Sequence, residues 1–478
     1  MGLANVVRAL PSEWPMFQHD LTHTGYSTSW APSTNETLWT YTLGTRTNGK
    51  QPTIADGRVY FGAFDGIYCL DATTSAFLWS YIISGTWLGI FSAPAVADGR
   101  VYTGCNDGRV YCFNAVTGAL IWNTAVLTNY FPSHPVVDSG RVYIGGADNL
   151  LFFCLDAATG ATLWTYPTHG NCYDCSPAVA DGFVYFTDSW GRTVYCLNAV
   201  TGAFKWTYTL GYNGGWGSTA VVNGIVYLGS TDNRVIALDA GTGALVWSYT
   251  TGAEVYGSPA VVDGKLYIGS FDYNVYCLNA VTGAFIWSYK TSTAVCSSPA
   301  VADGKVYIAS YDGNLYCLNA ATGAFIWSYT GLGNVGGKSP SIVNGIVYML
   351  TSNDPGQLLA FGGYYLTVKT DPPGTATISG EGWYDPGTPV TLTAPTGPPG
   401  ATLSFLNWDL DGTPETANPL VVTMSGPHTA TAHYYKIPVG GEWAPIDTAQ
   451  IVTPWIALAF LAIAFAAAGS HRLLKKRW

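Results

Sequence analysis

The chain has 478 residues, of which 48% are hydrophobic and only 10% charged, and this balance excludes an intrinsically disordered protein. Its formal net charge is −10, from 20 Lys and Arg against 30 Asp and Glu. Nucleic-acid partners require a basic surface, so the charge argues against them, while the length allows two or three domains.

Residues 1–32 form an N-terminal segment that precedes the repeats described below. Its first ten residues make a poor signal peptide, because the apolar run is short and is interrupted by Arg8. His19 and His23 are four residues apart, but a nearby proline and glycine disfavour the helix that would place both on one face. We therefore expect no metal site here, and a segment that packs against the next domain.

Residues 33–363 repeat a unit of about 40 residues. Residues 298–330 show it well, with four short apolar or alternating runs separated by Asp-Gly and Asn-x-x-Thr-Gly turns. The first turn recurs eight times, at Asp56, Asp98, Asp138, Asp181, Asn223, Asp263, Asp303 and Asn344. The last run carries a tryptophan, also eight times, at Trp39, Trp79, Trp122, Trp164, Trp206, Trp247, Trp287 and Trp327. Four antiparallel strands per unit predict one propeller blade.

The two series are offset along the chain. The first tryptophan run, around Trp39, precedes the first Asp-Gly turn, and no tryptophan run follows the last turn at Asn344. An N-terminal strand can therefore supply the outer strand of the last blade and remove an exposed sheet edge. The sequence predicts an all-β protein whose main domain is an eight-bladed propeller closed by that strand.

The tryptophan run belongs to a longer motif, complete in Ala237-Leu-Asp-Ala-Gly-Thr-Gly-Ala-Leu-Val-Trp247. This motif resembles the tryptophan-docking motif of the PQQ-binding-like, BamB-like propeller repeats. The resemblance covers about 70% of the chain, and it implies that the tryptophans pack between blades. A large aromatic residue repeated at one blade position is also what a core requires.

Enzymes of the wider quinoprotein family bind their quinone with two adjacent cysteines, a Ca²⁺ ion held by Glu, Asn and Asp, and a stacking Trp. This sequence has no Cys-Cys pair, and Glu is rare between residues 33 and 363. The sequence therefore predicts no quinone cofactor and no metal.

Six of the ten cysteines occupy one position of the blade, and a seventh blade has Ala237 there. They are Cys69, Cys112, Cys154, Cys196, Cys277 and Cys317. A small apolar residue is what this position requires, so we expect buried thiols. Cys172 and Cys175 lie in a loop, where either a local disulfide or two free thiols is possible.

Residues 364–436 lack the repeat, and their alternating Thr, Val and Leu runs predict a small β-sandwich-like domain. This stretch resembles the divergent B-repeat domains of microbial surface proteins, which implies a spacer. Asp409 and Asp411 suit a polar hairpin tip better than a calcium site.

Residues 437–450 form a linker, and residues 451–469 are 19 uncharged residues, long enough to cross a bilayer as a helix. The basic tail, residues 470–478, predicts a cytoplasmic C-terminus and a propeller outside the cell membrane. A cytosolic, tail-anchored orientation is the alternative, and unpaired cysteines would agree with it.

No Walker A loop, His-Glu-x-x-His or Gly-x-Ser-x-Gly motif is present, which favours a protein that is not an enzyme. The connections between blades vary and carry large aromatic residues: Trp87, Phe91, Tyr130, Phe131, Tyr173, Tyr212, Trp216 and Tyr256. These rings either fill the centre of the propeller or bind a protein, peptide or glycan. The leading interpretation is a membrane-anchored binding or assembly scaffold. A quinoprotein-like or other enzyme and a structural envelope component are the alternatives.

Overall fold

The computed structural model describes residues 13–47, 49–83, 89–126, 133–146, 149–172, 176–189, 192–211, 217–335, 337–395 and 403–436. All regular elements in these ranges are strands, as predicted. The predicted membrane segment, residues 451–469, lies outside them, and no helix within them is long and apolar enough to cross a membrane. The chain divides into two compact units, the first comprising residues up to 366 with 381–390 and 423–428.

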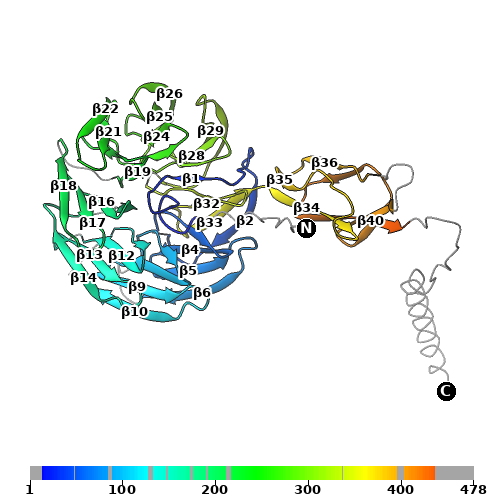
Figure 1. Ribbon diagram of the computed structural model, residues 1–478, viewed down its shortest axis with the longest axis horizontal. Coiled ribbons are helices and arrows are strands. Elements are labelled where there is room, and N and C mark those ends of the chain that lie inside the picture. The colour runs from blue at the N-terminus through cyan, green and yellow to red at the C-terminus, as the bar shows by residue number, and fades with distance from the viewer. Residues whose placement is uncertain are drawn as a thin grey trace, which may run out of the picture. The chain divides into compact units, whose positions relative to one another are not determined.

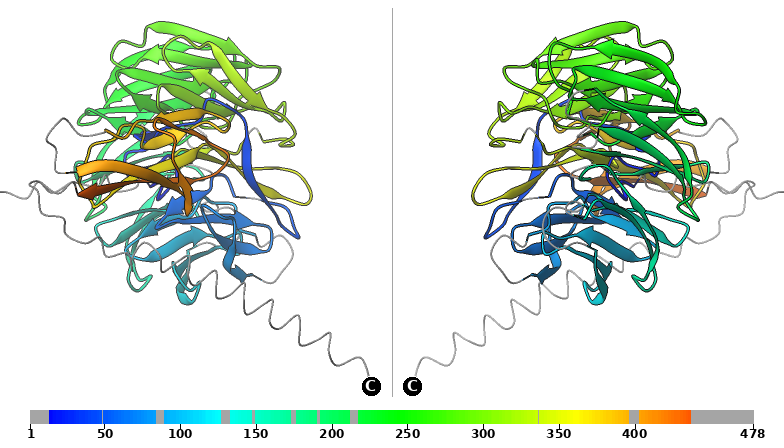
Figure 2. Two further views of the ribbon diagram at one scale, coloured as in Figure 1. Left: turned by 90° about the vertical axis from the view of Figure 1, so that its right-hand side faces the viewer. Right: turned by 90° about the vertical axis from the view of Figure 1, so that its left-hand side faces the viewer.

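The repeats form four-stranded antiparallel sheets, to one of which a fifth, parallel strand is added (Figures 1 and 2). Their first strands are β3 (Thr53–Ala55), β7 (Ala95–Ala97), β11 (Val136–Asp138), β15 (Ala178–Ala180), β19 (Ala220–Val222), β23 (Ala260–Val262), β27 (Ala300–Ala302) and β31 (Ser341–Val343). Each first strand contacts the next in this order, and β31 contacts β3. The sheets are thus the blades of a closed propeller.

The second and third strands of each blade form the middle hairpin. The second strands are β4 (Arg58–Ala63), β8 (Arg100–Gly104), β12 (Arg141–Gly145), β16 (Phe183–Asp188), β20 (Ile225–Ser230), β24 (Lys265–Gly269), β28 (Lys305–Ala309) and β32 (Ile346–Leu350). The third strands are β5 (Gly66–Asp71), β9 (Arg109–Asn114), β13 (Leu151–Asp156), β17 (Thr193–Asn198), β21 (Arg234–Asp239), β25 (Asn274–Asn279), β29 (Leu315–Asn319) and β33 (Gln357–Gly362).

The fourth, outermost strands carry the repeated tryptophans. They are β6 (Phe77–Ile82), β10 (Leu120–Ala125), β14 (Thr162–Pro167), β18 (Phe204–Thr209), β22 (Leu245–Thr250), β26 (Phe285–Lys290), β30 (Phe325–Tyr329) and β2 (Thr37–Thr42). The strand β2 comes from the N-terminus and pairs antiparallel with β33, with Trp39 opposite Ala360. This is the pairing that the offset between the two sequence series predicts.

The N-terminal segment packs against the propeller, as predicted, and does so through its backbone. Residues of the first strands donate their N–H groups to its carbonyl oxygens, and β1 (Tyr26–Ser27) pairs in parallel with β27. The donor–acceptor pairs are Val96 to Pro15, Val179 to Leu21, Val221 to Thr22, Val261 to Thr24 and Val301 to Gly25. The segment therefore runs across the innermost strands of five blades and satisfies donors that face the centre of the propeller.

Seven of the eight repeated tryptophans join their blade to the next one through the indole N–H. The Trp247 indole N–H donates to the carbonyl of Ala280 at 2.9 Å, and the hydroxyl of Tyr227 donates to the same carbonyl at 3.0 Å. The ring covers Gly283, where an added Cβ would lie 2.7 Å from it. Gly283 also has a φ of +72°, so glycine is required here both for space and for backbone conformation.

The seam that closes the ring departs from this pattern. Ser75, with a φ of +61°, occupies the position of that glycine in the first blade. The tryptophan facing this blade is Trp39, which is only half-buried and whose indole N–H has no hydrogen-bond partner among the described residues. We infer that the Cβ of Ser75 prevents Trp39 from docking as the other tryptophans do.

The C-terminal strands form two further sheets. One has the order β35 (Gly382–Tyr384), β34 (Tyr364–Asp371), β40 (His428–Lys436), β37 (Leu403–Leu410) and β38 (Thr413–Glu415). The other pairs β36 (Pro389–Leu392) with β39 (Leu420–Thr423). Asp409 and Asp411 accept hydrogen bonds from the backbone N–H groups of Gly412 and Thr429, so they stabilise a hairpin tip, as the sequence suggested.

Candidate ligand-binding cavity

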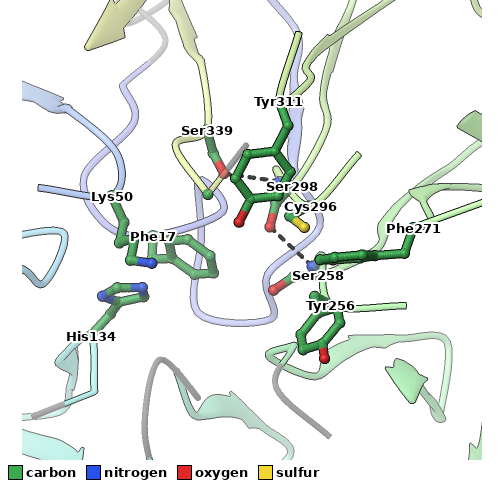
Figure 3. A pocket seen from close by; sticks show the side chains of 11 residues that line it. Phe17, Lys50, His134, Tyr256, Ser258, Phe271, Cys296, Ser298, Tyr311 and Ser339 are labelled. Atoms are coloured by element: carbon green, nitrogen blue, oxygen red, sulfur yellow. Dashed lines mark hydrogen bonds between the residues drawn. The ribbon is translucent and has the colours of Figure 1, made fainter. Parts of the chain in front are cut away.

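A cavity of about 330 Å³ opens where the first strands of several blades begin. It is lined by Phe17, Lys50, His134, Tyr256, Ser258, Phe271, Cys296, Ser298, Tyr311, Gly337 and Ser339 (Figure 3). Apart from Phe17, these residues come from the connections between blades or from the turns of middle hairpins. The cavity therefore lies on the face with variable connections, opposite the repeated Asp-Gly and Thr-Gly turns.

Three aromatic rings form one side of the cavity (Figure 3). The rings of Tyr256 and Phe271 have centroids 4.6 Å apart, and those of Phe271 and Tyr311 lie 6.0 Å apart, edge to face. Tyr311 is 39% exposed although it is large and largely apolar. A row of partly exposed rings on a rigid scaffold is typical of a binding surface.

The opposite side holds Phe17, His134 and Lys50 (Figure 3). Phe17 belongs to the N-terminal segment, and its ring lies 4.4 Å from the ring of His134. The Nδ1 atom of His134 accepts the backbone N–H of Ala93 at 3.0 Å, which orients the imidazole. The Lys50 ammonium lies beside Gly337, where an added Cβ would be 3.3 Å from Nζ.

Three serines, Ser258, Ser298 and Ser339, form the floor between the two sides, and they belong to a longer row with one serine from each of successive blades. From the second serine onwards, each hydroxyl oxygen accepts the backbone N–H of the preceding serine at 2.7–3.0 Å. The row runs Ser176, Ser218, Ser258, Ser298 and Ser339, and the last N–H donates to the Lys50 carbonyl at 2.8 Å. The same blade position is Gln51, Ala93 or His134 in the other blades, so the row of hydroxyls covers one part of the ring only.

A second lysine lies behind the first. The Lys338 Nζ is buried and donates to the carbonyl of Thr47 at 3.1 Å, to the hydroxyl of Thr47 at 3.1 Å and to the carbonyl of Gly49 at 3.2 Å. Burial, reinforced by the charge of Lys50, lowers the pKa of Lys338 to about 7. No carboxylate pairs with it among the described residues.

Of the eight aromatic residues predicted to form a site, the structure describes two. Tyr256 lines the cavity, whereas Phe91 contacts Phe64, with ring centroids 5.9 Å apart, and does not line it. The other six lie outside the described residues: Trp87, Tyr130, Phe131, Tyr173, Tyr212 and Trp216. Cys175 also lies outside, so the structure does not decide between a disulfide with Cys172 and two free thiols.

Sequence reasoning missed most of the lining residues. Phe271 and Tyr311 occupy the same place, directly before the Asp of the middle hairpin turn, where an aligned set of blades would have shown two adjacent rings. Lys50 and Phe17 carry no such signal, because neither belongs to a repeated motif. The six blade cysteines are fully buried thiols, as predicted.

The described residues do not match the donor set of the quinone enzymes. No group of three or more His, Cys, Asp or Glu side chains within the described ranges could hold a metal ion. The cavity lining instead offers hydroxyls, aromatic rings, one imidazole and one ammonium group. Such a lining can bind and orient a ligand, and it provides no carboxylate general base.

Solved structures with the same fold include dehydrogenases, a BamB and a designed protein. Quinohemoprotein alcohol dehydrogenase ADHIIG from Pseudomonas putida HK5 is 16% identical, with a TM-score of 0.64 over 73% of this chain and 80% of that one. BamB from Moraxella catarrhalis is 17% identical, with a TM-score of 0.55 over 68% of this chain and 99% of that one. The computationally designed Ika8 protein is 19% identical, with a TM-score of 0.59 over 68% of this chain and 98% of that one. At these identities the likeness concerns the fold alone.

A search of the curated proteins gave no match. The profile of the divergent InlB B-repeat domain matches residues 364–438. The profile described as outer membrane protein assembly factor BamB matches five overlapping stretches, residues 23–126, 64–212, 153–258, 192–300 and 254–363. Since these stretches together span well over half of the sequence, the chain belongs to the BamB family of PQQ-like propeller repeats.

Proposed function

We propose that this protein is a non-enzymatic binding scaffold, built on an eight-bladed propeller that β2 closes. Its partner, a protein, peptide or glycan, binds at the face with the variable connections. The predicted segment 451–469 holds the chain in the cell membrane with the propeller outside and the basic tail in the cytoplasm. The domain resembling B-repeats then serves as a spacer.

The observation that carries this proposal is the row of Tyr256, Phe271 and Tyr311 at the mouth of the cavity. These rings come from two adjacent blades, and their partial exposure is not needed to close the seams, which the repeated tryptophans already do. Exposing large rings is unfavourable unless a partner covers them. Because they frame a recess of suitable size, a partner's side chain or a small ligand can enter between them.

The experiment is capture of partners from native membranes, with the full chain as bait. The test variant is Phe271→Ala with Tyr311→Ala, and the matched control is Phe285→Ala, which removes a ring 52% exposed on the outer strand of the same blade as Phe271. We expect the test variant to capture at least tenfold less of a partner that the wild type and the control both capture. All three proteins should be equally folded. Equal capture by the test variant would contradict the proposal.

A quinone-dependent enzyme and a structural envelope component remain the competing functions. The quinone-dependent enzyme is a candidate because quinohemoprotein alcohol dehydrogenases have the same fold. Titration of the purified protein with quinone and Ca²⁺ tests it, and we expect neither a change in the quinone spectrum nor a shift in melting temperature. A saturable spectral change would favour the enzyme.

A further inference from the structure

We propose that the cavity binds the carboxylate of an acid with a compact apolar body, either a free acid or the C-terminus of a peptide. This inference rests on the proposed function, because it names the ligand chemistry of the same cavity. The acid group lies against Lys50 and the serine row, and the apolar body lies against Phe271 and Tyr311.

The serine row supplies directed hydrogen-bond donors. The hydroxyl oxygens of Ser258, Ser298 and Ser339 each accept one backbone N–H, and among the described residues none of the three donates its own proton to an acceptor. All three serines are at least 95% buried, with exposures of 3%, 5% and 2%. Buried donors require acceptors, and the open side of each hydroxyl is the cavity. A ligand with several acceptor oxygens meets that requirement.

The positive charge of Lys50 favours an anionic ligand group on the side of the cavity where the serine hydroxyls lie. The ammonium group of Lys50 lines the cavity, and Lys338 lies close enough to interact with it. Both Lys50 and the carboxylate of Glu254 act electrostatically on Cys296, and Glu254 also acts on Tyr256. The ammonium group at one side of the cavity favours an orientation in which a ligand's carboxylate lies towards Lys50.

The aromatic side and the volume of the cavity limit the size and polarity of the part of the ligand that carries the carboxylate. About 330 Å³ is near the lower end for small-molecule sites, so it holds an acid with one ring or one aliphatic side chain. The rings of Phe271 and Tyr311 complement an apolar group, which inorganic anions lack. A bare phosphate or sulfate ion would fill only the Lys50 end.

The test is calorimetric titration of the purified full chain with two matched pairs of probes. The first pair is 3-phenylpropionate and 3-phenylpropionamide, and the second is a short N-acetylated peptide ending in Phe, with a free or an amidated C-terminus. Inorganic phosphate serves as an anion without an apolar body. We expect at least one acid to bind at least tenfold more tightly than its amide and than phosphate; which acid binds separates a free ligand from a chain terminus.

Substitutions locate the site. Lys50→Gln should weaken acid binding at least tenfold and leave the amide unchanged. Ser298→Ala should weaken it several-fold, whereas Ser218→Ala, which removes the same type of hydroxyl outside the cavity, should change it less than twofold. Both serine variants are expected to fold, because the equivalent residue of another blade is already Ala93.

Two results would overturn the inference and separate it from the proposed function. If acids and amides bind alike, with loss in Phe271→Ala but not in Lys50→Gln, the cavity binds ligands but does not select carboxylates. If no probe binds and partner capture is also unaffected by the loss of Phe271 and Tyr311, the proposed function fails as well. Equal weakening by Ser218→Ala and Ser298→Ala would show that the effect is structural.

Discussion

The two faces of the propeller differ in how closely the blades repeat. On the turn face, an Asp or Asn in seven blades accepts N–H groups of its own turn, as Asp71 and Asn319 do. Glycines with positive φ admit the tryptophan of the preceding blade, as Gly243 and Gly283 do. On the cavity face, the residue two positions before the first strand is Gln51, Ala93, His134 or one of five serines. The residues that join the blades thus repeat from blade to blade, whereas those that line the cavity differ. We therefore look for function on the cavity face.

The largest effect is expected from a glycine of the turn face that is replaced by a residue with a side chain. Gly243→Ala should lower the free energy of unfolding by about 2–4 kcal/mol, because the φ of +74° disfavours a side chain and the new Cβ would lie 2.6 Å from the Trp206 ring. Denaturant unfolding measures this. Gly224→Ala is the control for backbone conformation alone, since its φ is +73° but its Cβ would meet nothing within 4 Å. Equal losses in both variants would remove the tryptophan from the explanation.

Behind the cavity face, Lys338 should make stability depend on pH. Its pKa is about 7 in the folded protein and about 10.5 when unfolded, so the unfolded state binds more protons between these values. Stability should therefore rise with pH, by about 1 kcal/mol per unit between pH 7 and 8.5. Lys338→Met should remove this rise, and Lys290→Met, at an exposed lysine, should keep it. An unchanged slope in Lys338→Met would contradict the assignment.

The buried thiols of the blades should lower stability as the pH rises further, whereas Lys338 raises it. Burial raises the pKa of Cys277 to about 12, so above pH 9 only the unfolded state ionises and stability falls as pH rises towards 12. Cys277→Ala should cost about 1 kcal/mol or less at pH 7, because Ala237 already fills the equivalent position, and it should reduce the alkaline slope. Unfolding measured at pH 7 and pH 10 checks both. A large loss at pH 7 would show that the thiol packs specifically.

The smallest effect should come from repairing the closing seam. Ser75→Gly relieves a φ of +61° on a residue with a Cβ and opens space for Trp39, so it should stabilise the protein by about 0.5–1 kcal/mol. In a structure of the variant, the indole N–H of Trp39 should donate to a backbone carbonyl, as that of Trp247 does to Ala280. A destabilised variant would mean that something other than Ser75 keeps Trp39 half-buried.

The sequence predicted the repeated parts of the fold well, because the same motif recurs in each blade and can be compared between blades. The strands around the tryptophans, the buried blade thiols and the pairing of β2 with β33 all follow from counting turns and tryptophans. The path of the N-terminal segment did not, since it is held by carbonyl oxygens that any sequence provides. The cavity was predicted only as a face and one lining residue, Tyr256. Lys50 and Phe17 reach it from segments without a period, so only the closed ring brings them together.

The most direct test of the account is to measure partner binding and thermal stability on one variant from each face. Phe271→Ala with Tyr311→Ala represents the cavity face, and Gly243→Ala represents the turn face, with binding measured at a temperature where both are folded. We predict that the first loses binding at least tenfold with a small change in melting temperature, and that the second melts earlier but binds as the wild type does. Retained binding in the first variant, or lost binding in the second, would contradict the division of roles between the two faces.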